Sequence, residues 1–207
     1  MTRRLAAAAV AAMLPLMTQA QDRFPPLSPE QMSPEQQRAA QAIIAGPRGA
    51  LAGPFNAWLR SPELADRFQR VGEYVRFHSS IPHALNELAI LVTARAWSAE
   101  FEWWAHYRIA LKAGLDPAIA DAIGAGRRPE GLSEDQRIVY QFCTELQHDR
   151  AVSDAAFAAA KARFGEQGVV DLIGVTGYYT AVAMTLNVAR VPVPPGTEVP
   201  PLAPLAR

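Results

Sequence analysis

Apolar residues recur at helical spacing along most of the chain, and no segment shows the alternation typical of a β-strand. Ile138, Val139, Phe142 and Leu146, for example, fall on one face of a helix. Residues 167–188 are nearly all apolar, which is typical of a helix buried at the centre of a domain or at a subunit interface. We therefore expect an all-α fold, a compact multi-helix bundle.

Helix starts are marked by residues that cap the first turn. Ser33-Pro34-Glu35-Gln36 combines a hydroxyl cap, a proline in the first turn and a glutamine three residues after the cap. Related starts are predicted at Ser61, Asp116, Ser133 and Ser153. The Ala-rich helix after Ser153 should stop at Gly165, and the last helix should run from about Gln167 to Val188.

The two ends of the chain differ from the helical part. Residues 1–20 have two arginines, then an apolar Ala-rich stretch, then Thr18-Gln19-Ala20, which is the layout of a secretory signal cleaved near Ala20. We expect a periplasmic or secreted protein; an Ala-rich terminal helix or a misassigned start is the alternative. Residues 21–32 are expected to be a leader, and residues 33–190 the helical domain. Residues 191–207 contain six prolines, which predicts an extended arm lying on its own domain or on a neighbouring subunit.

Composition excludes several classes of function. The chain has 207 residues, half of them apolar, and a formal net charge of zero, so no basic surface for nucleic acid is indicated. Apolar stretches after residue 20 carry charges or prolines within a few turns, so we expect no membrane span once the signal is removed. Cys143 is the single cysteine, and no internal disulfide can form.

Glu87 and His106 give the clearest chemical signal. Glu87 is the only acid in the apolar segment 83–97, and His106 closes the following segment 99–106. Burying an unpaired carboxylate costs several kcal/mol, so we expect Glu87 to pair with His106 on the neighbouring helix. Such a pair is suited to moving protons near neutral pH.

Residues 86–95 and 100–115 resemble the signature of the carboxymuconolactone decarboxylase family, an all-helical family that includes the alkylhydroperoxidase D type proteins. The Gly46-Pro-Arg-Gly49 run and Gly177-Tyr178 extend the resemblance over roughly residues 30–192. It implies an alkylhydroperoxidase D-like bundle and a homo-oligomer, either a trimer or a hexamer. It also implies that Glu87 and His106 meet in a pocket, with Glu102 as the acid of the family's aromatic-Glu-Trp run.

Redox members of this family carry a Cys-x-x-Cys pair seven and four residues before the histidine, where this chain has Ala99 and Glu102. A dithiol peroxidase needs both thiols, so peroxidase activity is the disfavoured alternative. The resemblance instead favours the decarboxylase branch, which needs neither metal nor organic cofactor. His106 would donate or accept the proton, with Glu87 orienting it and Glu102 assisting.

The same reasoning predicts the residues that bind a small-molecule substrate. Arg95 could meet a substrate carboxylate through its bidentate guanidinium. Trp103 or Trp104 could form an apolar wall together with Tyr107. Three alternatives stay open. The Glu/His pair could be only a buried structural contact. His83, Glu87 and His106 could bind a divalent metal ion. The domain could also be a non-catalytic binding or assembly module.

Overall fold

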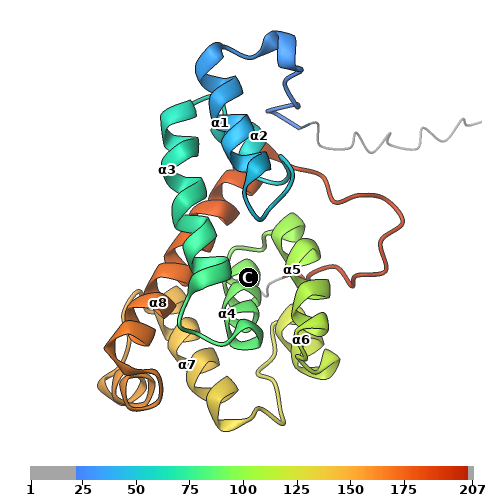
Figure 1. Cartoon of the computed structure of the whole chain (residues 1–207). Helices are drawn as coiled ribbons and strands as arrows, with labels where there is room; N and C mark the ends of the chain where they lie inside the picture. Colours follow the sequence, from blue (N-terminus) through green and yellow to red (C-terminus); the bar gives the residue numbers. More distant parts are fainter. Residues whose placement is uncertain (1–21, 205–207) are drawn as a thin grey trace, which may run out of the picture.

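The fold is all-α over residues 22–204, the part of the chain that the computed structural model describes (Figure 1). The predicted signal peptide lies outside these residues. The elements are the 3-10 helix η1 (Pro29–Gln31), a π-helical turn η2 (Tyr74–His78) and eight α-helices within the described range. These are α1 (Pro34–Ala45), α2 (Phe55–Trp58), α3 (Pro62–Glu73), α4 (His83–Ala96), α5 (Glu100–Lys112), α6 (Pro117–Gly124), α7 (Glu134–His148) and α8 (Asp154–Ala189).

Most of the predicted caps are formed. The Ser33 and Ser133 hydroxyls each accept from a backbone N–H three residues later, and both close a capping box. Asp116 caps α6 by accepting from the Ala118 N–H, and Ser153 caps α8 by accepting from the Ala156 N–H. Ser61 precedes α3 as expected, but its side chain makes no capping hydrogen bond, so the predicted hydroxyl cap is wrong there.

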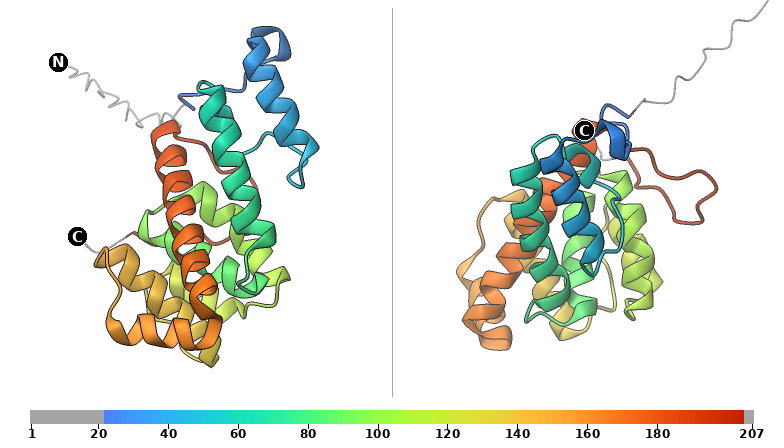
Figure 2. Two further views of the ribbon diagram at one scale, coloured as in Figure 1. Left: turned by 60° about the vertical axis from the view of Figure 1, so that its left-hand side comes forward. Right: turned by 45° about the horizontal axis from the view of Figure 1, so that its top comes forward.

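Helix α4 is the centre of the bundle and packs against α5, α6, α7 and α8. Every residue from Leu85 to Arg95 is buried, so α4 is covered on all sides. Helices α1 and α3 pack together at one end, and α3 lies beside α8 (Figures 1 and 2). This arrangement surrounds Glu87, which is on α4, with other helices.

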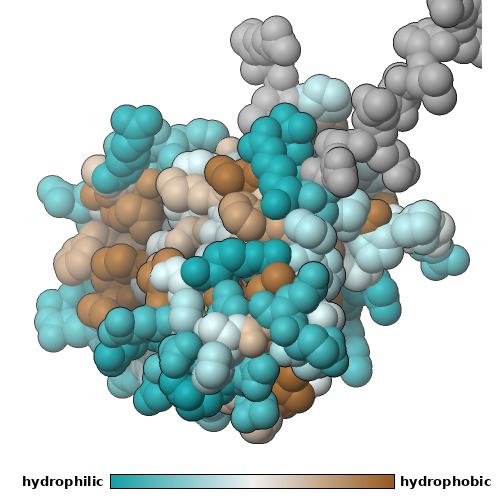
Figure 3. Space-filling view, turned by 90° about the horizontal axis from the view of Figure 1, so that it is seen from above, coloured by the Kyte–Doolittle hydropathy of each residue, from teal (hydrophilic) through white to brown (hydrophobic). Residues whose placement is uncertain are grey.

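Helix α8 bends at Gly165, whose φ of 72° is a left-handed value that glycine adopts without steric cost. The predicted Ala-rich helix and the predicted last helix are therefore the two arms of α8. By length and composition α8 could cross a membrane, but 56 % of its most apolar 18-residue stretch is buried inside the domain. Val170, Ile173, Met184 and Val188 remain exposed. Apolar side chains lie among hydrophilic ones on the surface seen in Figure 3, and homo-oligomerisation stays a prediction.

The proline-rich segment after α8 has no regular secondary structure up to residue 204; it loops outward beside α5 and then returns to the helices (Figure 1). Trp104 Nε1 donates to Thr197 Oγ1 and Trp103 Nε1 donates to the Pro200 carbonyl, both at 2.8 Å. The Ala203 N–H donates to the Gly124 carbonyl at the end of α6. These bonds fasten the segment across α5, the helix that carries His106.

Candidate functional site

Glu87 and His106 are in direct contact between α4 and α5. His106 Nδ1 lies 2.8 Å from Glu87 Oε2, and the two residues are 6 % and 0 % exposed. An ionised carboxylate only accepts hydrogen bonds, so Nδ1 carries a proton and Nε2 is left for another partner. The imidazole ring of His106 and the ring of Tyr179 pack in a T-shaped arrangement, with centroids 4.9 Å apart. The pair thus fixes both the orientation and the tautomer of His106.

Glu102 lies one turn before His106 on α5 and is 1 % exposed. Neither of its carboxyl oxygens has a hydrogen-bond partner among residues 22–204. Burial raises the pKa of Glu102 well above its usual value, because a charged carboxylate here would lose its hydration without compensation. Burial therefore favours the neutral carboxylic acid, which is able to donate a proton.

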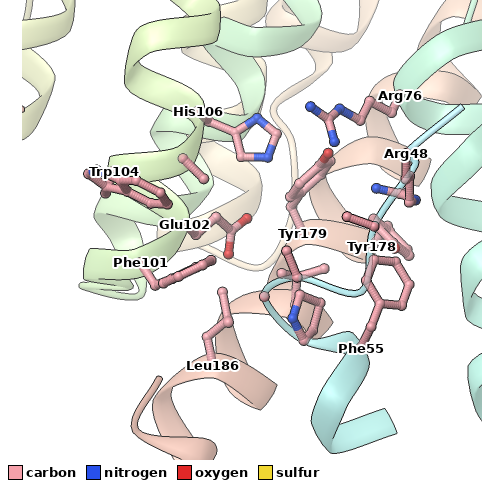
Figure 4. Close-up of a pocket in the computed structure, with 16 residues that line it drawn as sticks. Arg48, Phe55, Arg76, Phe101, Glu102, Trp104, His106, Tyr178, Tyr179 and Leu186 are labelled. Atoms are coloured by element: carbon pink, nitrogen blue, oxygen red, sulfur yellow. The ribbon is translucent and has the colours of Figure 1, made fainter. Parts of the chain in front are cut away.

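Glu102 and His106 line a cavity of about 180 Å³ (Figure 4). The wall opposite them is formed by Tyr178 and Tyr179 of α8 and by two arginines. The apolar part of the lining includes Pro54, Phe55, Phe101, Trp104, Val182 and Leu186. An apolar cavity with a few convergent polar groups is the usual form of a small-molecule site.

The two arginines are Arg48, in the loop between α1 and α2, and Arg76, in the π-helical turn η2. Nε and Nη2 of Arg48 and Nε of Arg76 are buried, without a hydrogen-bond partner in the part of the chain described. Arg48 also stacks on the Phe55 ring, 5.1 Å from its centroid. The free donors are suited to an anionic group of a ligand, since guanidinium binds carboxylates by two parallel hydrogen bonds.

Burial also sets the protonation of the tyrosines. It raises the pKa of Tyr178 to about 12 and the pKa of Tyr179 well above 10, against the opposing effect of the nearby arginines. Both phenols are therefore neutral hydrogen-bond donors near pH 7. The Tyr179 hydroxyl is buried and has no partner among the described residues.

Sequence reasoning missed Arg48 and Arg76. Arg48 belongs to the Gly46-Pro-Arg-Gly49 run that contributed to the family resemblance, so a signal for it was present in the sequence. Arg76 follows no recognisable motif. It is placed by a π-helical turn, a local irregularity that is common at functional sites and that no periodicity predicts.

Arg95, Trp103 and Tyr107, which we expected to bind substrate, do not line this cavity. Arg95 lies eight residues beyond Glu87, which is about 12 Å along the helix axis. Trp103 and Tyr107 each follow a cavity residue by one position and so point about 100° around the helix from it. Trp103 bonds to the Pro200 carbonyl and Tyr107 donates to Asp121 Oδ1. These three residues therefore lie apart from the His106 cavity, and their expected substrate contacts stay a prediction.

Cys143 is buried on α7, outside the cavity lining, and its Sγ lies 3.5 Å from Thr176 Oγ1. Burial raises its pKa to about 12, so it remains a thiol near pH 7 and lacks the thiolate that attacks peroxide.

The expected metal alternative is not formed either. His83 is exposed and lines a different hollow, next to Ile81 and Lys112. Within residues 22–204 no group of three or more His, Cys, Asp or Glu side chains is arranged to hold a metal ion.

The family model described as "Carboxymuconolactone decarboxylase family" matches residues 62–134. No curated protein matches the chain. The family match supports a carboxymuconolactone decarboxylase-like or alkylhydroperoxidase-like function. Residues 62–134, which include Glu87, Glu102 and His106, are therefore the part of the chain that is similar to the carboxymuconolactone decarboxylase family.

Proposed function

We propose that the His106 cavity catalyses cofactor-independent proton transfer on a small organic acid, with decarboxylation of a lactone or keto acid as its reaction. The observation that carries this proposal is the pairing of two groups with opposite roles. His106 has an oriented, free Nε2, and Glu102 beside it is a buried neutral acid. Two acid–base groups held in different protonation states by their surroundings are typical of such sites.

In the proposed reaction, the bond from a substrate carbon to its carboxylate breaks and CO2 leaves. The electron pair passes into the conjugated carbonyl of the substrate, forming an enolate. Glu102 delivers its proton to the carbon, and the free Nε2 of His106 accepts a hydrogen bond from the water that re-protonates Glu102. The proton lost from Glu102 is thus replaced from solvent. Positioned proton transfer of this kind contributes about 10²–10⁴-fold to the rate.

The arginines determine the orientation of the substrate. The unpaired fork of Arg48 and the Nε of Arg76 would bind a carboxylate that remains on the substrate throughout. If they bound the departing carboxylate instead, they would stabilise the ground state more than the transition state and slow the reaction. We therefore expect substrates with a retained acidic group as well as the one that is lost.

The test is a screen of small lactones and keto acids for CO2 release. Wild type, His106→Ala and Glu87→Gln are compared, with His83→Ala as the matched control because His83 is an exposed histidine on α4 outside the cavity. We expect His106→Ala to lose about 10²–10⁴-fold of turnover, while His83→Ala retains it. Equal rates in all variants would refute the proposed site.

The same proteins test two other functions. A peroxidase would consume peroxide in a Cys143-dependent manner, which Cys143→Ala would abolish; the high pKa of this thiol argues against that outcome. A non-catalytic binding module would release no CO2 with any substrate, and its ligand affinity would survive His106→Ala.

A further inference from the structure

A second cavity, of about 140 Å³, lies among α4, α6 and α7 and shares no lining residue with the His106 cavity. Its polar lining residues are Arg95, Arg127, Tyr140, Thr144 and His148. No acidic residue lines it. The cavity is thus a pocket with cationic groups and no anionic group of its own.

Arg95 is the central feature of this second cavity. It is only 7 % exposed, although it carries a permanent positive charge. Its Nη1 donates to the Ala203 carbonyl at 2.6 Å, while Nε and Nη2 are buried and have no partner among residues 22–204. No Asp or Glu of the described chain forms an ion pair with it. A buried charge without a counter-ion is costly, so Arg95 lacks a partner that its surroundings call for.

The identity of the two unpaired nitrogens indicates the shape of that partner. Nε and Nη2 form the side-on fork of a guanidinium, whose parallel N–H bonds match two oxygens of one carboxylate or phosphate. Nη1 points to the other side, and so the bond to Ala203 leaves the fork free. Holding the C-terminal segment in place requires only Nη1 of Arg95. It does not explain why Nε and Nη2 are buried without a partner.

Two neighbours of Arg95 support the same interpretation. Gly126 has no side chain, and a Cβ there would lie 3.6 Å from Nη2 and 3.7 Å from Nε, close to the fork. Thr144 Oγ1 is also buried without a partner among the described residues, and it lines the same cavity. A hydroxyl and a guanidinium fork facing one small space can bind a single oxyanion together.

We propose that this second cavity binds a small oxyanion, such as phosphate or a carboxylate. Arg95 binds two of its oxygens, Thr144 donates a further hydrogen bond, and the exposed Arg127 and His148 close the outer side of the site. The inference does not depend on the reaction proposed for the His106 cavity, because no residue is common to the two sites.

The test is calorimetric titration of the whole chain with sodium phosphate and, separately, with sodium acetate, at an ionic strength held constant with sodium chloride. We expect Arg95→Gln to weaken phosphate binding by about tenfold or more, because charge-assisted hydrogen bonds are lost. Arg127→Ala alters an exposed side chain, so it should leave the fold intact and weaken binding by a smaller factor. A stronger response to phosphate than to acetate assigns the site to phosphate, and the reverse assigns it to carboxylates.

The Thr144→Val variant tests whether the Thr144 hydroxyl serves anion binding or only the stability of the fold. Removing a buried hydroxyl without a partner should raise the unfolding midpoint of the ligand-free protein, yet it should weaken phosphate binding. Arg48→Ala removes any anion bound in the other cavity and should leave in place the binding that depends on Arg95. The proposal is overturned if phosphate and acetate both give no heat beyond chloride, or if Arg95→Gln and Thr144→Val bind as wild type does.

Discussion

Replacing Glu102 by Gln tests the protonation state on which the proposed chemistry depends. Gln has nearly the same shape as a neutral carboxylic acid but cannot ionise. In wild type the unfolded carboxyl ionises near pH 4.5, whereas burial holds the pKa of folded Glu102 well above that value. The unfolded state therefore binds fewer protons than the folded state above pH 4.5, and wild-type stability falls as pH rises.

The size of this effect follows from the linkage relation. Between the unfolded and folded pKa values, one proton is lost on unfolding, so the free energy of unfolding falls by about 1.4 kcal/mol per pH unit. The contribution of neutral Glu102 is thus fully present below pH 4.5 and is lost progressively above it. Glu102→Gln lacks the dependence, and its unpaired amide adds only an offset that does not vary with pH.

The assay is urea unfolding of wild type and Glu102→Gln at several pH values from 4 to 8. All other carboxyl groups are common to both proteins, so the difference in unfolding free energy isolates Glu102. We expect the difference to shift in favour of Glu102→Gln by about 1.4 kcal/mol per pH unit above pH 4.5. Glu130→Gln, which alters an exposed acid, should show no such trend. A difference that stays constant with pH would refute the argument, because Glu102 would then titrate as it does in the unfolded chain.

Three further substitutions test the surroundings of the cavity. Arg48→Ala should raise KM for an acidic substrate about tenfold or more, because a bidentate contact is removed. Steady-state kinetics measures this, and an unchanged KM would exclude Arg48 from substrate binding. Gly72→Ala should lower both stability and activity, because its Cβ would lie 2.1 Å from Tyr178 Oη. Thermal unfolding and turnover measure these effects. A variant that behaves like wild type would contradict the close packing of Gly72 against Tyr178. Trp103→Phe should destabilise the domain by about 1 kcal/mol by removing the hydrogen bond to Pro200, and unaltered urea unfolding would show that the C-terminal segment does not stabilise α5.

The candidate site was predicted from the sequence only in part. Glu87 and His106 could be paired from the sequence because a buried acid needs a partner and the next helix offered an imidazole; the structure brings them to 2.8 Å. Glu102 could be placed near them because positions four apart share a helix face. Arg95 was assigned by the same local logic, yet eight residues along a helix change both height and direction, and it lies in a different cavity.

By itself, the sequence determined the features that depend on neighbours in the chain. Helical periodicity, the caps at Ser33 and Ser133 and the break at Gly165 are local, because each depends on hydrogen bonds or backbone angles within a few residues. Only the tertiary structure decided which side chains from distant segments share one space. Arg48 reaches the cavity from a loop, and Arg76 reaches it from a π-helical turn that packs against α8; neither path follows from a repeating sequence pattern.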